Sequence, residues 1–539
     1  MATNTSSKYD DIISKSVLIQ SGSPARYQLI PEKEEIGTLT RMTLGEKHVN
    51  KINKTILLVG ETGAGKSALI NALVNYAMGV KWEDDVWFQI VEDEKRSQSE
   101  SQTSDVIVYQ IFGFEDETLP YSLTIIDTPG YGDTKGTEQD VRVSHRLLDW
   151  FRSEDGVHEI NAVGLVLKAT ENRLSDRLSY IFDSVVSLFG KDMEKNIVAL
   201  LTHSDGRKPK NVLKALEAAN IKFARNEKNQ PVYFLFNICQ DDDRTEDTED
   251  LKHADEVTTK GMSQFTDFLG KAAPQKLITT VAVLNSRIRL TACIQNLQER
   301  ITFTELKQTE IQQTQELLKK YEQEMKNNEE FTVEVEEVYK DRETISVGWW
   351  GWLFFYKAAT CCTVCKENCH YPGCTVARSP GSCEVMKDGR CTSCTRKCPT
   401  SDHVKEKWIY VTKTRKVKTT KEDMKKKYEK GKAETETKVN LLESLQKEME
   451  NLEANKTQCL DEAYEHVVNL EKIALNVVSL STYVHLDVLI QEMEKKKDTE
   501  KVQKLKLMSS RVDKGLLAGL KYVYNEVFKG NKHDRDSGV

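Results

Sequence analysis

The stretch Gly60-Glu61-Thr62-Gly63-Ala64-Gly65-Lys66-Ser67 stands between an apolar run, ILLVG (56–60), and a helix-forming segment, SALINALVNYAM (67–78). It has the spacing GxxxxGK[ST] in the strand–loop–helix context that this phosphate-binding motif requires. Glycines let backbone N–H groups turn inward around phosphate oxygens, and the helix start adds positive potential. We predict that these eight residues cradle the phosphates of a nucleotide. Lys66 would reach the β- and γ-phosphates and the Ser67 hydroxyl would bind Mg²⁺; a glycine-rich turn without ligand is the alternative.

Two further segments are placed to hold the metal ion and the γ-phosphate. The apolar run SLTIID (122–127) ends in Asp127-Thr128-Pro129-Gly130, where Asp127 would hold Mg²⁺ through water and the Gly130 N–H would meet the γ-phosphate. Thr103 precedes the predicted strand 106–112 and is placed to bind Mg²⁺ when a γ-phosphate is present. A solvated hydroxyl is the alternative for Thr103, and two neighbouring hydroxyls would serve instead, Ser101 and Ser104. The predicted catalytic groups are Lys66, Thr103 and Gly130.

A third segment is suited to selecting the base. The run NIVALLT (196–202) leads into Thr202-His203-Ser204-Asp205. A carboxylate in the position of Asp205 accepts from both the ring N–H and the exocyclic amine of guanine, a pattern that adenine does not present. His203 would stack on the base through its imidazole, and Asn237 would support the base from below. An ordinary helix-capping role is the alternative for Asp205.

Apolar runs alternate with amphipathic segments from Thr55 to about Gly270, which predicts βαβ units around a mostly parallel, doubly wound sheet buried on both faces. The second and third runs, joined by a short turn at 117–120, read as an antiparallel hairpin. The predicted strands are 56–60, 106–112, 122–127, 162–167, 196–202 and 232–236, and the predicted helices between them are 138–152, 174–190, 209–225 and 255–270. These elements with the phosphate loop predict the fold class as an α/β P-loop domain, and a base-selecting Asp205 makes a GTPase domain the expected kind.

Composition changes after Pro274. Two stretches rich in Glu, Lys, Gln and Leu, 275–330 and 421–475, predict long helices paired as an imperfect coiled coil, and 480–528 predicts further helix. Between them, FTVEVEEVY (331–339) and WIYVTKTRKVKTT (408–420) alternate as strands and bracket a Cys-rich block. We therefore expect a helical stalk carrying a two-stranded ribbon with a small Cys-rich knob at its tip. The predicted segments are an N-terminal extension (1–50), a G domain (51–272), a stalk helix (273–330), the ribbon with its knob (331–420, knob 361–403) and a C-terminal helical region (421–539).

Nine of the 12 cysteines fall in residues 361–398, and two sub-blocks share one spacing. Cys362, Cys365, Cys369 and Cys374 are followed, each 29 residues later, by Cys391, Cys394, Cys398 and His403. Two sets of four soft ligands suit two tetrahedral Zn²⁺ ions in a structural role, and whether the sets stay separate or interleave is open. Three further residues are alternates as ligands: Cys361, His370 and Cys383. Disulfides, an Fe–S cluster and unliganded thiols are the other interpretations of the block.

Composition limits the function classes. The chain has 539 residues, 30 % of them charged and 39 % hydrophobic, with a net charge of −7, so neither wholesale disorder nor a nucleic-acid role is expected. Its longest apolar run, 347–356, is about half the length that spans a bilayer. The N-terminus lacks the pattern of a signal peptide and the second residue is Ala2, so we expect a cytoplasmic protein.

With these residues in place, the chain resembles GTPases of the translation-factor-related class, and within it the paraseptin group: septins, chloroplast-import GTPases and immunity-associated nucleotide-binding GTPases. The resemblance covers residues 50–270. It rests on GETGAGKS (60–67), on the septin-like DTPGYGD (127–133), and on two segments similar to the immunity-associated family, RLSDRLSYIFDSVVSLFG (173–190) and NIVALLTHSD (196–205). The C-terminal half resembles no family that we can name.

The resemblance implies a Mg²⁺·GTP/GDP site, switch loops around Thr103 and Gly130–Gly136, slow hydrolysis and nucleotide-dependent dimerisation. Tyr131 departs from the Ras pattern because it stands where those proteins carry a water-orienting Gln. Catalysis would then rely on Thr103, on backbone groups or on a partner's residue. Arg96 and Arg142 are candidates for an arginine donated in trans, and solvated surface charge is the alternative for both.

Two functions follow as hypotheses. The first is a slow GTPase whose homodimerisation or oligomerisation depends on nucleotide, with the C-terminal half contacting protein partners. The second is a nucleotide-binding scaffold with negligible turnover, and an ATPase is disfavoured by Asp205. The aromatic segment 349–356 and the basic run 413–432 leave contact with a membrane surface open, although packing under the knob and a solvated face are the plainer interpretations.

Overall fold

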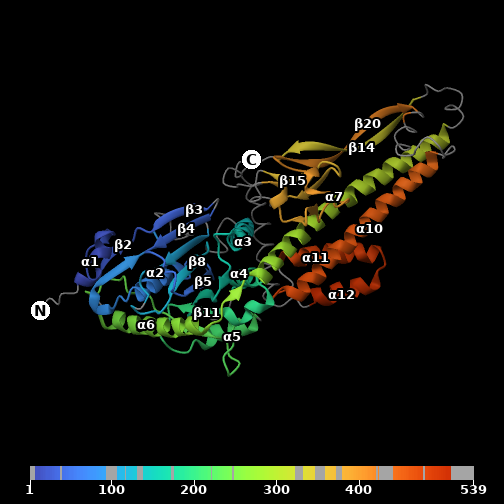
Figure 1. The fold of residues 1–539 in the computed structure, drawn as a ribbon. Helices are drawn as coiled ribbons and strands as arrows, with labels where there is room; N and C mark the ends of the chain where they lie inside the picture. The colour runs from blue at the N-terminus through green and yellow to red at the C-terminus, as the bar shows by residue number, and fades with distance from the viewer. Residues whose placement is uncertain are drawn as a thin grey trace, which may run out of the picture. The chain divides into compact units, whose positions relative to one another are not determined.

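The computed structural model divides into two compact units. The first contains Met1–Leu284 and Ile473–Leu480, and the second contains Asn285–Lys472 and Ser481–Ser509 (Figure 1). None of the helices in the described ranges is long and apolar enough to cross a membrane. The structure describes residues 6–36, 39–92, 106–115, 117–129, 137–171, 175–219, 221–245, 248–321, 332–345, 358–371, 379–420, 423, 441–476 and 480–510.

An eight-stranded sheet forms the centre of the first unit. Five strands are parallel, and β7 pairs antiparallel with β8, which confirms the predicted sheet and its hairpin. Two strands at one end of the sheet were not predicted: β4 is parallel to β7, and the edge strand β3 is antiparallel to β4. The order across the sheet is β12 (Tyr233–Leu235), β11 (Ile197–Thr202), β10 (Ala162–Lys168), β5 (Asn53–Gly60), β8 (Ser122–Asp127), β7 (Ile107–Ile111), β4 (Leu39–Leu44) and β3 (Glu32–Ile36).

Helices cover both faces of this sheet, because its central strands are apolar on both sides. Leu57 and Leu58 are neighbours in β5 that point to opposite faces, and both are fully buried. One face shares a core with α2 and α6, whose Leu69 and Phe265 are fully buried. The helices of this unit are α1 (Ser6–Ser14), α2 (Lys66–Ala77), α3 (Thr137–Arg152), α4 (Asp176–Val186), α5 (Lys210–Ala218) and α6 (Thr248–Lys271).

A small sheet is attached to α2 through buried amide side chains. Asn75 bonds both the N–H and the carbonyl of Phe88 at 3.0 and 2.7 Å, and Asn71 accepts from the N–H of Ile90 at 3.0 Å. These bonds satisfy backbone groups of an edge strand that would otherwise be buried without partners. The sheet consists of β1 (Val17–Gln20), β2 (Ala25–Gln28) and β6 (Val86–Gln89), and a separate short pair joins β9 (Glu159–Ile160) to β13 (Gln275–Lys276).

The second unit is built on antiparallel helices. Ser286, early in α7, meets Asn469, late in α10, at 3.1 Å, whereas Gln308, further along α7, meets the earlier Glu453, also at 3.1 Å. Figure 1 shows these two helices side by side. The predicted pairing of long helices is therefore confirmed, while its coiled-coil character stays a prediction. The helices are α7 (Ile278–Lys320), α10 (Leu441–Ile473), α11 (Leu480–Lys495) and α12 (Thr499–Ser509).

The predicted ribbon is present over its full length. β14 (Thr332–Thr344) and β20 (Trp408–Thr420) pair antiparallel through 13 consecutive residues each. The backbone N–H of Val338 donates to Glu310 of α7 at 2.8 Å, so β14 returns along the helix that precedes it. This contact distinguishes the structure from a ribbon that projects freely from the stalk.

The Cys-rich knob stands at the end of the ribbon and packs on α7. Asn296 donates to the carbonyl of Ser393 at 2.9 Å, and Arg289 donates to the carbonyl of Glu384 at 2.8 Å. The knob contains little regular structure: a sheet of β16 (Glu367–His370), β15 (Ala359–Cys362) and β19 (His403–Glu406), the short pair β17 (Met386–Lys387) and β18 (Arg390–Cys391), and the turns η4 (Pro380–Ser382) and η5 (Thr400–Asp402).

One buried ion pair joins the knob to α7. The Arg300 guanidinium lies 2.6 Å from Glu367, and each side chain is 9 % exposed. Arg300 also donates to the carbonyl of Ser393 at 2.8 Å and contacts the sulfur of Cys459 on α10. A buried pair with this many hydrogen bonds is costly to break, because the remaining carboxylate would be left in a dry site.

We expect Arg300→Met to lower the free energy of unfolding of the second unit by ~3–5 kcal/mol, because it leaves Glu367 charged and buried. The measurement is urea unfolding followed by circular dichroism. Arg415→Met is the matched control, since Arg415 pairs with Glu337 on the exposed ribbon at 2.7 Å, where an ion pair contributes little. Equal effects of the two substitutions would contradict this interpretation of Arg300.

Candidate functional site

The loop between β5 and α2 has the backbone shape of a phosphate cradle. Gly63 and Gly65 have φ angles of 76° and 91°, in the region that favours glycine. A Cβ on Gly65 would lie 3.2 Å from the Thr202 methyl group. Gly65 precedes the first residue of α2 and gives that helix no side-chain cap. The first-turn N–H groups therefore face the loop without a side-chain acceptor, as an anion site at a helix start requires.

The side chains of the loop fit a bound anion. Lys66 is 8 % exposed, and its ammonium group donates to the carbonyls of Gly60 and Glu61 at 2.9 and 3.2 Å. Burial lowers the pKa of Lys66, and the negative charges of Asp127 and Glu61 oppose that shift. The hydroxyl of Thr62 is buried and has no hydrogen-bond partner among the described residues. An anion in the loop would compensate the buried ammonium group and accept from this hydroxyl.

The residues predicted to hold Mg²⁺ fall partly within the described structure. Ser67 lies in the first turn of α2, and the fully buried Asp127 ends β8 beside Leu58, two residues before the loop begins. The hydroxyl of Thr128 donates to the carbonyl of Leu58 at 2.8 Å and fastens the chain after β8 to β5. Outside the described residues lie Arg96, Ser101, Thr103, Ser104, Gly130 and Tyr131, together with the side chain of Arg142.

The segment after β11 contacts the phosphate loop directly. Thr202 donates from its hydroxyl to the carbonyl of Ala64 at 2.7 Å, a contact that the sequence did not predict. His203 adopts a φ of 51° and places Nδ1 3.0 Å from the Thr202 hydroxyl. Burial and the nearby Lys168 lower the pKa of His203, which favours the neutral imidazole suited to stacking on a base.

Two residues predicted to recognise the base line one pocket. Asp205 has a 70 % exposed side chain and accepts from the N–H of Arg207 at 2.9 Å. Asn237 lies two residues beyond the end of β12 and bonds Thr258 through its backbone N–H at 3.0 Å. Asp205 and Asn237 both line a pocket beside α6. Their roles in base recognition stay predictions.

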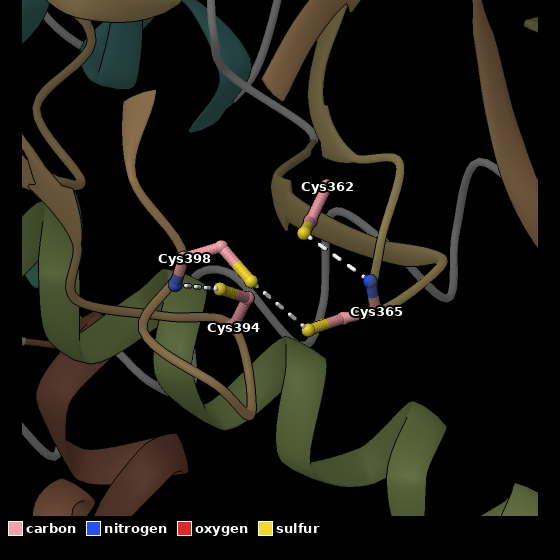
Figure 2. A group of neighbouring side chains, drawn as sticks. All are labelled: Cys362, Cys365, Cys394 and Cys398. Carbon is pink, nitrogen blue, oxygen red and sulfur yellow. Dashed lines mark hydrogen bonds between the residues drawn. The ribbon is translucent and has the colours of Figure 1, made fainter. Parts of the chain in front are cut away.

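A first group of four sulfurs in the knob combines both Cys sub-blocks. Cys362 ends β15 and Cys365 lies in the turn that follows it, whereas Cys394 and Cys398 come from the loop after β18. All four sulfurs lie within 4.8 Å of one another. Figure 2 shows the four side chains as close neighbours, with dashed lines between Cys362 and Cys365, between Cys394 and Cys398, and between the Cys365 and Cys398 sulfurs. The Cys365 and Cys398 sulfurs are 3.7 Å apart, well beyond a disulfide bond.

A second group also draws on both sub-blocks. Cys369, Cys391 and Cys394 lie with a ring nitrogen of His403 within 4.8 Å of one another, and all four residues are buried. His403 Nδ1 is 2.9 Å from the carbonyl of Pro399, which leaves Nε2 as the lone-pair nitrogen when Nδ1 donates. Within the described chain Nε2 is buried without a hydrogen-bond partner. Zinc-bound histidines are oriented in this way.

Backbone N–H groups point at the sulfurs of both groups. The N–H groups of Cys365 and Cys398 lie 3.3 and 3.2 Å from the sulfurs of Cys362 and Cys394, and the N–H of Cys394 lies 3.3 Å from the Cys391 sulfur. Hydrogen bonds from neighbouring thiols, first of all Cys362, lower the pKa of Cys394. Shared hydrogen bonds raise the pKa of Cys365, and burial raises the pKa of Cys369 and of Cys398. The backbone N–H contacts are therefore what favours thiolates, the form that binds metal. The described residues thus fit a tetrahedral metal such as Zn²⁺.

The three alternative ligands, Cys361, His370 and Cys383, lie in two different environments. His370 Nδ1 lies 3.3 Å from both the Cys383 sulfur and a Glu384 oxygen, in a third buried group that can hold a metal. The sequence did not single out Glu384, since one Glu in a highly charged chain carries no signal. Cys361 instead contacts Asn368 at 3.5 Å within an apolar cluster. Cys374 lies outside the described residues.

Comparison with known proteins identifies the type of domain at the phosphate loop. Residues 54–246 match the model of the AIG1 family, which confirms the predicted resemblance to immunity-associated GTPases. The first unit therefore has the fold of a P-loop GTPase domain, and residues 54–246 are similar to the AIG1 family. The match does not extend into the C-terminal half, and no curated protein sequence matches the chain.

Solved GTPase structures resemble the chain only distantly. Toc33 from Arabidopsis thaliana with Mg²⁺ and GMPPNP is 15 % identical with a TM-score of 0.29, and the match covers 42 % of this chain and 88 % of that one. The same protein with GDP and Mg²⁺ gives 15 % identity and a TM-score of 0.28, covering 41 % and 86 %. Elongation factor SelB from Methanococcus maripaludis with the GTP analogue GPPNHP gives 13 % and 0.24, covering 42 % and 36 %.

We expect metal analysis of the reduced full-length chain to find zinc, and removal by a chelator to lower the melting temperature of the second unit. His403→Ala should retain less zinc after dialysis, because it deletes the lone-pair nitrogen of one group. His158→Ala is the matched control, since His158 is an exposed residue of the first unit. Wild-type protein that contains no zinc would contradict the metal assignment.

Proposed function

We propose that this protein binds guanine nucleotide with Mg²⁺ and hydrolyses GTP slowly. The carrying observation is the phosphate loop, in which the buried ammonium group of Lys66 stands at the open amino end of α2. Within the described part of the chain this cation bonds to two carbonyl oxygens, and a polyphosphate would compensate its buried charge. The match to the AIG1 family over residues 54–246 supports the same conclusion.

Guanine specificity is the part of the proposal that rests on Asp205. Its carboxylate borders the pocket that Asn237 also lines, and Thr202 connects this region to the phosphate loop through the carbonyl of Ala64. An acceptor pair in this position distinguishes guanine from adenine, because only guanine presents two adjacent donors. In this proposal Asp205 recognises the base and Lys66 binds the phosphates.

We further propose that two protomers meet through their G domains when GTP is bound. Tyr131 offers no amide to orient the attacking water, so a group from a second protomer would supply what one protomer lacks. Arg142, in α3, is a candidate for that group. In the C-terminal half, zinc would hold the knob together, and the helices and ribbon would contact protein partners.

A nucleotide-binding scaffold is the second candidate function. The knob, the ribbon and the paired helices account for about half of the chain and present no second nucleotide loop among the described residues. In that case the nucleotide would stabilise the first unit without being consumed. Phosphate release above background distinguishes the slow GTPase from the scaffold.

Calorimetry with GDP, GTP, ADP and ATP tests nucleotide binding. We expect guanine nucleotides to bind and adenine nucleotides to bind at least tenfold more weakly. Lys66→Ala should abolish binding, whereas Asp205→Ala should weaken GDP binding and reduce discrimination against ADP. Lys54→Ala is a matched control for Lys66, because Lys54 is a buried lysine of β5 that bonds carbonyls at 3.2 and 3.3 Å near residue 271. Equal binding of all four nucleotides would contradict the role of Asp205.

A dilution series tests the dimer. The GTPase rate per molecule should rise with protein concentration, because the completed site needs two protomers. Arg142→Ala should remove the concentration-dependent part, and Arg152→Ala, at the other end of α3, serves as its control. A rate per molecule that is flat across the series argues against the dimer, and a rate at background favours the scaffold.

A further inference from the structure

The two groups of metal-binding donors in the knob have one residue in common. Cys394 lies within 4.8 Å of the sulfurs of Cys362, Cys365 and Cys398, and also within 4.8 Å of the donors of the second group, whose other members are Cys369, Cys391 and His403. Its side chain is fully buried. The two groups are therefore neighbours that meet at one sulfur atom.

The two groups together contain one donor atom fewer than two separate tetrahedral ions need. Two tetrahedral zinc ions require eight ligand positions. The described residues of the two groups supply seven donor atoms. A thiolate sulfur has three lone pairs, so one sulfur can occupy a position on each of two ions and complete both tetrahedra.

We propose that Cys394 is a bridging thiolate in a binuclear zinc cluster. One ion is held by Cys362, Cys365, Cys394 and Cys398, and the other is held by Cys369, Cys391, Cys394 and His403. This inference rests on the proposed zinc content of the knob. It adds that the two ions are directly coupled through one sulfur and form a single unit.

The order of ligands along the chain fits this arrangement. Cys391, Cys394 and Cys398 follow one another in a single loop, with Cys394 between a ligand of one ion and a ligand of the other. The N–H of Cys398 donates to the Cys394 sulfur at 3.2 Å, and the N–H of Cys394 donates to the Cys391 sulfur at 3.3 Å. This loop thereby holds the central sulfur between the two ions.

Sharing one sulfur also limits the charge inside the knob. Six thiolates and one neutral imidazole around two Zn²⁺ ions leave two net negative charges, one fewer than a set of seven thiolates would leave. Each additional negative charge in a buried site is costly unless it is paired. Backbone N–H groups directed at the Cys362, Cys391 and Cys394 sulfurs help to offset the charge that remains.

The competing arrangement has eight separate ligands. In it, Cys374 supplies the eighth donor and Cys394 binds one ion only. The two arrangements predict different effects of Cys374→Ser. A bridged cluster retains both ions in this variant, whereas an unbridged pair binds one of its two ions more weakly.

The test uses reduced full-length protein reconstituted with ¹¹³Cd²⁺, which replaces zinc at thiolate sites and is observed directly by NMR. A bridging sulfur transmits scalar coupling between two cadmium nuclei, so we expect a pair of resonances that split each other. Two uncoupled resonances would overturn the bridge while leaving the zinc proposal intact. Absence of bound metal would overturn the zinc proposal itself, and the bridge with it.

Substitutions provide an independent measurement through the rate at which a chelator removes zinc. Cys398→Ser should release one zinc equivalent quickly, Cys374→Ser should release zinc at the wild-type rate, and Cys394→Ser should release two equivalents quickly. Fast loss of only one equivalent from Cys394→Ser, together with fast loss from Cys374→Ser, would overturn the bridge. If Cys394→Ser fails to fold, the wild-type cadmium spectrum and the Cys374→Ser result still decide the question.

Discussion

The buried ammonium group of Lys66 is the constraint on which the first unit depends. Taking a charge out of water is costly, and the protein offers it two carbonyl oxygens and the negative charge of Asp127 at the end of β8. The position of Lys66 requires α2 to start where β5 ends, and it requires β8 to pair with β5 so that Asp127 stands nearby. The phosphate loop is therefore shaped by three features together: the order of strands in the sheet, the turn glycines and the hydroxyl of Thr202.

In the second unit, the knob has little apolar core to stabilise it. Its interior consists mainly of cysteine sulfurs together with Val385, Met386 and the buried Arg300–Glu367 pair. In the proposed zinc knob, sulfurs that bind a common metal ion would replace the apolar contacts that a larger domain buries. The ion pair fixes this small structure on α7, and the proposed zinc would add the stabilisation that a larger domain obtains from apolar packing.

Most of the sheet could be predicted from the sequence because parallel strands buried on both faces read as continuous apolar runs. β5, β8, β10 and β11 are strands of this kind. The edge strand β3, with the sequence EKEEI, could not be recognised, because its exposed residues carry no apolar signal. The small sheet of β1, β2 and β6 depends on Asn71 and Asn75, whose bonds to β6 are made only when the chain is folded.

The sequence by itself determined which chemistry this protein contains. The spacing of Gly60–Ser67 specifies a phosphate loop, since that function depends on backbone shape and on residues adjacent in the chain. The repeat from Cys362 to His403 likewise predicts a set of metal-binding side chains. Only the tertiary structure decided which of these donors meet: folding places Cys362 and Cys365 with Cys394 and Cys398, across the two sub-blocks. The reason is physical, because a metal site selects donors by their distance in space, and a repeat along the chain does not set that distance.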